Sequence, residues 1–538
     1  MAFFKRIPLH PFLFAIYAIL AMLASNIGQL EVIIAFRSLV VIPLGILILL
    51  FILRLVVKDW HKASILLSLL VVLFFSFGHI YLALEEVYVF GEPLGRYRYL
   101  GPLWIALGLL GGWWALRSWR NLIQINQVLN TVGLLALVFP VIQIVVFGLQ
   151  TPTIGPEEED VLLVENVGFV TTTNLHVPEG ETPPDIYYII LDMYVRDDVL
   201  KDIFDFNNSP FLDRITDMGF FVARCSQSNY TDTPLSFASS FNAAYLESFA
   251  EDLISRNLDH YRIEPYVRNS LVLRALKDLG YTIVNIESGF FLSEWRDADM
   301  YLSGNVEASS RVFTFGGLNA FEGMLLQSTV GKWIYDNRPS LPAFIRPYLD
   351  QPYIERRDQI LYALETLEDM ASISGPKFVF VHIVAPHPPF VFGPNGEFVV
   401  RNTPLTLNFD FEDREWDRYV PGYRGQIIYL NNRFEAILEA ILEESARPPI
   451  IVLQSDHGIT RVSSARERVA ILNAYHLPGG GNEFLYPSIS PVNTFRLIFN
   501  FYFGGSFDLL EDVSYLWESD KGPYEFEVVH STNAECGE

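Results

Sequence analysis

At residues 449–458 the sequence reads PIIVLQSDHG, a continuous apolar run that ends in polar side chains and a glycine. Four similar runs occur: DIYYIIL (185–191), GFFVA (219–223), YTIVNI (281–286) and KFVFVHI (377–383). Most are continuous and not alternating, which is typical of parallel strands covered on both faces. Amphipathic helical patterns lie between them, the clearest at 423–443. This order predicts an α/β/α sandwich over residues 185–538, with ligands bound at the carboxyl ends of its strands.

Polar side chains stand at those carboxyl ends. Asp192 follows the run 185–191, and Asp456 and His457 follow the run that ends at 454. The run 377–383 contains His382 and leads to His387. Carboxylate oxygens, imidazole nitrogens and a hydroxyl form a mixed ligand set that suits Zn²⁺ or Mn²⁺ better than Mg²⁺ or Ca²⁺. The sequence therefore predicts a divalent metal site at this edge of the sheet.

The hydroxyl comes from the segment SNYTDTPLS, residues 228–236, where a helical pattern begins. A cation beside Thr231 would lower the pKa of its hydroxyl and make it a nucleophile, and the helix N-terminus could hold a phosphate or sulfate. Thr233 is the second candidate. Each residue also has a purely structural interpretation, since Asp192 or Thr231 could cap a helix and His387 could be a loop residue.

The first 150 residues have a different composition. They contain five apolar stretches of about the 20 residues that cross a bilayer: Pro8–Leu30, Ser38–Val57, Ala63–Leu84, Leu100–Leu116 and Val128–Leu149. They carry few ionisable residues inside, which favours an anchor over a transporter. Residues 151–184 are rich in Pro, Gly, Thr and Glu and are predicted to form a linker.

The short loops of this part indicate its orientation. With the N-terminus in the cytoplasm, seven cations lie on the inner side and three on the outer side, which the positive-inside rule favours. The inner set is Lys5, Arg6, Arg54, Lys58, Lys62, Arg117 and Arg120, and the outer set is Arg37, Arg96 and Arg98. Five spans then place everything after residue 150 outside the cytoplasmic membrane.

Charge separates the same two parts. The whole chain has 538 residues, 51% of them hydrophobic, and a net charge of −24. Residues 1–150 carry +5, so the remainder carries −29. No nucleic-acid partner is expected, because the acidic part offers no basic face. Near the C-terminus, the apolar run PVNTFRLIFNFYF is predicted to pack against the sheet, and the acidic tail beyond it is expected to fray.

Together these motifs resemble the alkaline phosphatase/sulfatase superfamily, and within it the five-span lipoteichoic acid synthases and lipid A phosphoethanolamine transferases. The resemblance implies that Asp192, Thr231, Asp456 and His457 bind the catalytic metal and that Thr231 is the nucleophile. It is carried by scattered motifs over roughly residues 185–480.

The same resemblance suggests substrate contacts. HIVAPHPPF, which contains His382 and His387, is similar to the family's histidine region for substrate oxygens, and His387 is the preferred phosphate contact. GFFLSEWRDADMYL (289–302) resembles the segment whose Trp and Arg hold a glycerophosphate group in lipoteichoic acid synthases, which points to Trp295 and Arg296.

The resemblance implies a membrane phosphotransferase. It would move phosphoglycerol or phosphoethanolamine from a phospholipid donor to an envelope glycan or lipid through a phospho-threonine. A phosphate or sulfate ester hydrolase is the first alternative, although the C/S-x-P-x-R signature of sulfatases is absent from residues 225–241. The other alternative is a membrane-anchored binding or structural protein that has lost catalysis.

Overall fold

The computed structural model describes residues 8–28, 30, 32–85, 87–117, 122–150, 175–304, 317–400, 416–459, 464–518 and 521–530. The chain divides into two compact units. Among the described residues, the first unit holds those up to 150 together with 317–354, and the second holds most of the rest. Residues 151–174 of the predicted linker lie outside the described residues.

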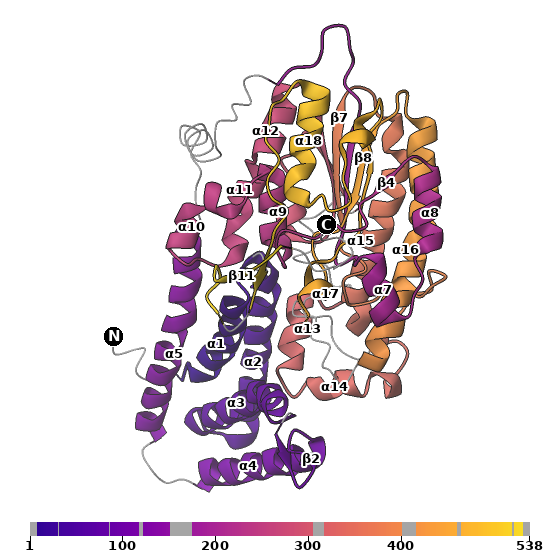
Figure 1. The fold of residues 1–538 in the computed structure, drawn as a ribbon. Helices are drawn as coiled ribbons and strands as arrows, with labels where there is room; N and C mark the ends of the chain where they lie inside the picture. The colour runs from indigo at the N-terminus through magenta and orange to yellow at the C-terminus, as the bar shows by residue number, and fades with distance from the viewer. Residues whose placement is uncertain are drawn as a thin grey trace. The chain divides into compact units, whose positions relative to one another are not determined.

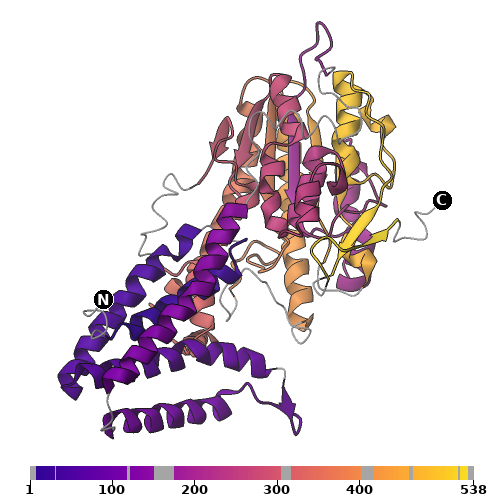
Figure 2. The same ribbon diagram turned by 90° about the vertical axis from the view of Figure 1, so that its left-hand side faces the viewer.

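The first unit contains five apolar helices, drawn in indigo to purple in Figures 1 and 2: α1 (His10–Ser25), α2 (Phe36–Val57), α3 (Trp60–Glu85), α4 (Tyr97–Arg117) and α5 (Leu122–Gln150). Among the described residues, four helices are long and apolar enough to cross a membrane, and α1 is shorter, with 16 residues. At 1.5 Å per residue α1 spans about 24 Å, less than a typical hydrocarbon core. The chain therefore begins with four to five membrane-type helices. A short hairpin of β1 (Tyr88–Val89) and β2 (Glu92–Pro93) precedes α4.

A later part of the chain returns to this unit. Helix α13 (Ala320–Gln327) packs Phe321 and Leu325 against Ile19 and Leu23 of α1, and α14 (Lys332–Asp336) follows it. Arg37 forms an ion pair with Glu322. The apolar stretches of the sequence do not reveal this return, because α13 and α14 are too short to register as spans.

The second unit is built on a seven-stranded sheet of order β4-β9-β8-β3-β7-β5-β6. Its strands are β3 (Ile186–Leu191), β4 (Phe221–Val222), β5 (Thr282–Ile286), β6 (Met300–Leu302), β7 (Lys377–Ile383), β8 (Ile450–Gln454) and β9 (Asn473–His476). The five predicted strands are present, and β3, β7 and β8 are buried at every residue. The sheet is nevertheless mixed, because β9 runs antiparallel to both β8 and β4.

Helices cover both faces of the sheet (Figure 1). Helices α9 (Thr233–Asn242), α10 (Glu251–Ser255), α11 (Glu264–Arg268), α12 (Leu271–Asp278) and α18 (Pro491–Phe503) form one layer, whose core includes Tyr188 and Ile190 of β3. Helices α7 (Asp197–Phe204), α8 (Ser209–Asp217) and α16 (Trp416–Glu444) lie on the other face. Helix α17 (Ala465–Val469) also belongs to this unit, as does the part of α15 (Arg346–Glu368) from residue 355 onward. The α/β/α sandwich expected from the sequence is therefore the architecture of this unit.

The C-terminal stretch is more ordered than the sequence suggests. As predicted, α18 packs into the core, but the chain beyond it forms a hairpin of β10 (Ser514–Trp517) and β11 (Phe526–Val529). Tyr515 N donates to Asn229 O at 2.8 Å, and the ring of Tyr515 stacks on Tyr230. The expected fraying is wrong for the described part of this tail, because aromatic contacts and backbone hydrogen bonds hold it against residues 229–230.

Candidate metal and phosphoryl-transfer site

The first carboxylate of the site sits on a strained turn after β3. Asp192 follows the last residue of the strand, and Met193 adopts a φ of 63°, which is uncommon for a residue other than glycine. This conformation directs Met193 N toward Asp456 Oδ1, at 3.3 Å, while Met193 O accepts a hydrogen bond from Tyr423 at 2.7 Å. The turn thus joins the ends of β3 and β8, and backbone strain of this kind is often found at functional sites.

Hydrogen bonds also hold the loop after β8 in place. Ser455 Oγ accepts a hydrogen bond from Tyr194 N at 2.9 Å and donates one to His457 O at 3.0 Å. A Cβ atom at Gly458 would lie 2.3 Å from Glu467 O, so only glycine fits there. The Asp-His-Gly motif therefore combines two candidate metal-binding side chains with a glycine that lets the backbone pack closely against Glu467.

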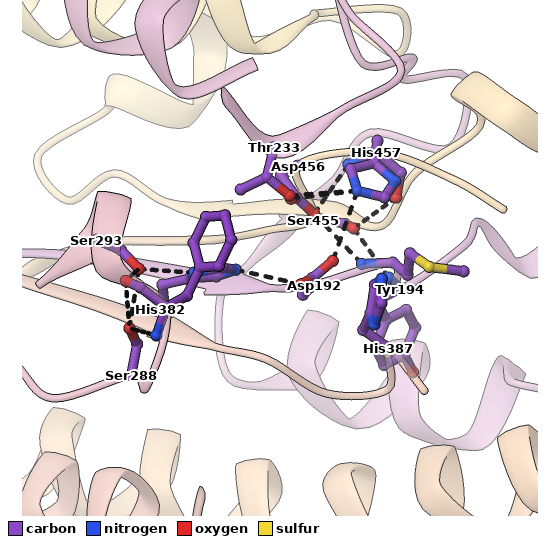
Figure 3. Close-up of polar contacts among 12 residues, drawn as sticks. Asp192, Tyr194, Thr233, Ser288, Ser293, His382, His387, Ser455, Asp456 and His457 are labelled. Atoms are coloured by element: carbon purple, nitrogen blue, oxygen red, sulfur yellow. Dashed lines mark hydrogen bonds and ion pairs between the residues drawn. The ribbon is translucent and has the colours of Figure 1, made fainter. Parts of the chain in front are cut away.

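The hydroxyl of the site belongs to Thr233. Asp232 caps α9 by accepting a hydrogen bond from Leu235 N at 3.1 Å, so that Thr233 is the first residue of the helix. Thr233 Oγ1 donates to Asp456 Oδ2 at 2.7 Å and lies 3.3 Å from His457 Nε2 (Figure 3).

Thr231, the nucleophile expected from the sequence, points elsewhere. Its Oγ1 accepts a hydrogen bond from Trp517 N, on β10, at 3.3 Å. The helix cap determines which threonine lies in the site. Because Asp232 is the cap, Thr231 lies outside the helix, and the hydroxyl of Thr233, the first helical residue, points toward the site. The structure brings Thr233 to Asp456 and His457, in place of Thr231.

The other three expected metal ligands lie together. Asp192, Asp456 and His457 are buried, and each offers a ligand atom within 4.8 Å of the others. His457 Nε2 is 3.6 Å from Asp192 Oδ1 and 3.6 Å from Asp456 Oδ2. Asp192 Oδ1 is buried and accepts no hydrogen bond from the described residues, which is costly for a carboxylate unless a cation satisfies it. Oxygen and nitrogen donors so arranged fit a divalent cation.

His382 lies on the other side of Asp192 (Figure 3). It is fully buried on β7, and its Nδ1 is 2.9 Å from Ser293 Oγ, which in turn contacts Ser288 Oγ. Its Nε2 is 3.6 Å from Asp192 Oδ2 and has no hydrogen-bond partner among the described residues. The two serines therefore orient the ring so that Nε2 faces the site.

His387 completes the group. Its backbone N–H donates to Asp192 O at 3.0 Å, and its ring centre is 6.5 Å from that of His457. Its Nδ1 lies 2.6 Å from Pro388 O. Both histidines that the sequence offers as phosphate contacts are thus beside the candidate metal ligands.

The electrostatics of the site favour an ionised carboxylate. Burial alone would raise the pKa of Asp192, but His387, His382 and His457 outweigh it and hold that pKa well below its usual value. Burial lowers the pKa of His387, in spite of the opposing charge of Asp192. Burial also acts to lower the pKa of His457, but Asp456 and Asp192 reverse the direction and raise it.

Trp295 and Arg296 are not part of this group. Trp295 is 3% exposed, stacks on Phe380 with ring centres 4.5 Å apart, and donates from Nε1 to Leu292 O at 3.2 Å. Arg296 is half-exposed and forms an ion pair with Glu294 at 3.2 Å. The structure places the tryptophan in the core of the sandwich and the arginine at its surface.

The sequence gives no sign of a further cation near the site. Burial lowers the pKa of Arg356, on α15, to about 10, while the charge of Asp192 opposes this shift. Arg356 is not at a strand end, so the rule that located Asp192 could not find it. Ser288 and Ser293 were also missed, although both lie within or next to the segment singled out for Trp295.

No family model and no curated protein matches this chain. Several solved structures do match it. The chain is similar to the C-terminal periplasmic domain of EcEptC from Escherichia coli, with 13% identity, a TM-score of 0.42, and 66% of this chain and 95% of that chain covered.

Two further solved structures match with similar identity and TM-score. The lipooligosaccharide phosphoethanolamine transferase A (EptA) from Neisseria meningitidis is 12% identical, with a TM-score of 0.35, over 89% of this chain and 88% of that one. The putative sulfatase yidJ from Bacteroides fragilis is 14% identical, with a TM-score of 0.37, over 64% and 83%. At such low identity and TM-score, none of these likenesses bears on what this chain binds or transforms.

Proposed function

We propose that this chain is a membrane-bound, metal-dependent transferase that moves a phospholipid head group through a phosphorylated Thr233. The observation that carries the proposal is the 2.7 Å hydrogen bond from Thr233 Oγ1 to Asp456 Oδ2, beside the buried Asp192 and His457. A hydroxyl at a helix N-terminus next to candidate metal ligands has the position of a nucleophile that attacks phosphorus. Thr233 takes the role first given to Thr231.

The side chains can carry both halves of such a reaction. A divalent cation held by Asp192, Asp456, His457 and Thr233 would lower the pKa of the hydroxyl and offset charge on the phosphoryl oxygens. Asp456 Oδ2 already accepts the Thr233 hydrogen and would take the proton as the Thr233 Oγ–phosphorus bond forms. The bond from phosphorus to the diacylglycerol oxygen breaks, and that oxygen would take the proton from Asp456 as diacylglycerol leaves.

The second half restores the threonine. An acceptor hydroxyl attacks the phosphorus and would lose its proton to Asp456 Oδ2, the Thr233 Oγ–phosphorus bond breaks, and Thr233 Oγ regains that proton as the acceptor leaves with the head group. His387 and His382, on the two sides of Asp192, are the proposed contacts for the non-bridging phosphate oxygens. The donor would carry phosphoglycerol or phosphoethanolamine, and the acceptor would be an envelope glycan or lipid. Water as the acceptor would make the same site a hydrolase.

The membrane unit fits a donor that lies in the bilayer. We propose that all five helices cross the cytoplasmic membrane with the N-terminus inside, so that the second unit is extracytoplasmic. The seven inner and three outer cations support this orientation. Helix α1 can span if residues beside its described 16 extend its apolar stretch, since the sequence from Pro8 to Leu30 carries no Asp, Glu, Lys or Arg and is polar only at His10, Ser25, Asn26 and Gln29.

Lipid turnover by the purified full-length protein tests the proposal. The protein in detergent is incubated with labelled phosphatidylglycerol or phosphatidylethanolamine, with and without a hydroxyl acceptor, and diacylglycerol release is followed. Release that EDTA abolishes and Zn²⁺ or Mn²⁺ restores is expected, with head-group phosphate found on the peptide that contains Thr233.

Two other outcomes would replace the proposal. A soluble phosphoester released at the same rate without an acceptor would indicate a hydrolase. A protein that purifies without metal and releases no diacylglycerol from either lipid would indicate a binding or structural protein.

A further inference from the structure

A second buried histidine lies next to the nucleophile helix but outside the metal group. His260 begins a short 3₁₀ turn and is 7% exposed. Its Nδ1 contacts Asp232 Oδ2, and its Nε2 contacts Pro523 O in the loop between β10 and β11. The rings of Trp517 and Tyr524 pack against it, with ring centres 5.2 and 5.3 Å from the centre of the imidazole.

Both contacts of this ring are to hydrogen-bond acceptors. A carboxylate oxygen and a backbone carbonyl can only accept, and a neutral imidazole can donate from only one of its two nitrogens. Both hydrogen bonds are therefore made together only by a protonated His260. Burial opposes that charge, but Asp232 and Asp259 outweigh it and raise the pKa of His260.

Asp232 connects this imidazolium to the site. One oxygen of the carboxylate accepts from His260, and the other accepts from Leu235 N as the cap of α9. The residue after Asp232 is Thr233, whose hydroxyl meets Asp456. A series of contacts thus runs from Pro523 through His260 and Asp232 to the first turn of α9.

The C-terminal hairpin holds the other side of the same segment. Trp517 N donates to Thr231 Oγ1, Tyr515 N donates to Asn229 O, and Ser514 Oγ donates to Ser228 O at 2.7 Å. The segment before Thr233 is therefore hydrogen-bonded to the hairpin at residues 228, 229 and 231.

We propose that His260 is a positioning residue for Thr233. As an imidazolium between Asp232 and the loop at Pro523, it fixes the cap of α9 and so sets the threonine hydroxyl on Asp456 and His457. The role rests on the proposed function, in which Thr233 is nucleophile and metal ligand. It also makes the C-terminal hairpin a part of the active site.

A double-mutant cycle in the full-length protein tests this role. The variants H260Q, D232N and the double variant are compared with the wild type for kcat and KM on the phospholipid donor and for Zn²⁺ affinity by calorimetry. The matched control is H476Q, since His476 is also partly buried and also contacts a backbone carbonyl, Pro449 O at 2.8 Å, but lies outside the site.

We expect H260Q to lower kcat about tenfold with little change in KM, because a supporting contact of a catalytic group is typically worth about 10- to 100-fold. The double variant should be no worse than D232N alone, because His260 acts through Asp232. H476Q should match the wild type. Additive losses in the double variant, or a wild-type kcat in H260Q, would overturn the role.

Zn²⁺ affinity separates this inference from the proposed function. Removing a cation near a metal site would by itself tighten metal binding, whereas misplacing Thr233 should weaken it, and we expect Zn²⁺ affinity to fall severalfold in H260Q. Unchanged or tighter binding overturns the role. If the wild type binds Zn²⁺ but turns over neither lipid, the proposed function fails and the affinities still decide the positioning role. A wild type that binds no Zn²⁺ overturns both.

If H260Q does not accumulate as a folded protein, D232N decides alone. Asparagine keeps an acceptor for the helix cap but loses the charge that faces His260. A lowered kcat and weaker Zn²⁺ binding in D232N support the role, and wild-type values overturn it.

Discussion

Thr233 Oγ1 donates to Asp456 Oδ2 at 2.7 Å, although the two residues are 223 positions apart in the chain. Thr231, only two residues earlier, turns its hydroxyl to Trp517 N instead. The different partners of the two hydroxyls distinguish two candidate nucleophiles that lie only two residues apart in the sequence.

Valine at either position keeps the shape of threonine and removes the hydroxyl. We expect T233V to lower kcat by at least about 10³-fold, since loss of a nucleophile leaves only binding and electrostatic effects. T231V should keep most of the activity and lose about 1 kcal/mol of stability with its hydrogen bond. Diacylglycerol release and thermal melting of both variants measure this. A more severe loss in T231V would return the role to Thr231.

Asp192 Oδ1, which accepts no hydrogen bond from the described residues, leads to a prediction about metal content. D192N should purify with far less Zn²⁺ or Mn²⁺ than the wild type, with affinity lower by at least about 100-fold, because an amide replaces a charged ligand. Elemental analysis of the purified proteins measures this. The control is D202N, at a half-exposed carboxylate that pairs with Arg466 at 2.9 Å. Equal metal in D192N and D202N would contradict the ligand assignment.

Gly458 should not tolerate alanine. The added Cβ would meet the backbone at Glu467 O, 2.3 Å away, so G458A must push apart the loop that carries Asp456 and His457. Overpacking of this kind costs about 1–3 kcal/mol, and we expect a lower melting temperature together with weaker metal binding. G101A, where no atom lies within 4 Å of the added Cβ, is the control. A G458A protein that melts and binds metal as the wild type does would show that the loop can yield.

His260 makes the stability of the chain depend on pH in a defined direction. Its pKa is raised in the folded protein above the ordinary 6.5, so the folded state holds this proton more tightly than the unfolded state. The stabilisation is complete below pH 6.5 and is lost as pH rises through the raised pKa.

The comparison of wild type with H260Q isolates this effect, because other groups titrate in both proteins. Among the described residues, the titratable groups that face His260 are Asp232, Asp259 and the phenol of Tyr524. We expect the difference in melting temperature to be largest near pH 6 and to shrink as the medium becomes alkaline. A difference that grows with pH would mean that His260 is neutral in the folded protein.

Fluorescent-protein fusions at the two chain ends test whether the number of membrane-spanning helices is odd or even. Green fluorescent protein does not fluoresce when it is exported unfolded, so a fusion at the N-terminus should be bright and one at the C-terminus dark. That result requires an odd number of crossings and therefore includes α1. Two bright fusions would indicate four spans and a cytoplasmic second unit, and would contradict the proposed orientation.

The sheet and most of its ligand edge could be predicted because they follow from local pattern. Continuous apolar runs identify buried strands wherever they pair, and the residue after such a run falls at the carboxyl edge. Asp192, Asp456, His457, His382 and His387 were found in this way. Strands β6 (MYL) and β9 (NAYH) were not, since three or four residues are too few to give a periodic signal.

The sequence by itself determined that the chain has an apolar, cationic N-terminal part, an acidic α/β/α part, and two carboxylates and three histidines at one edge of a sheet. Only the tertiary structure decided which threonine joins them and what holds it there. The choice depends on the cap at Asp232 and on contacts from His260 and the hairpin near Trp517, which come from distant parts of the chain. Periodicity records how a segment is buried, but the direction of each hydroxyl also depends on partners such as Asp456 and Trp517, which lie 223 and 286 residues away and which no local pattern contains.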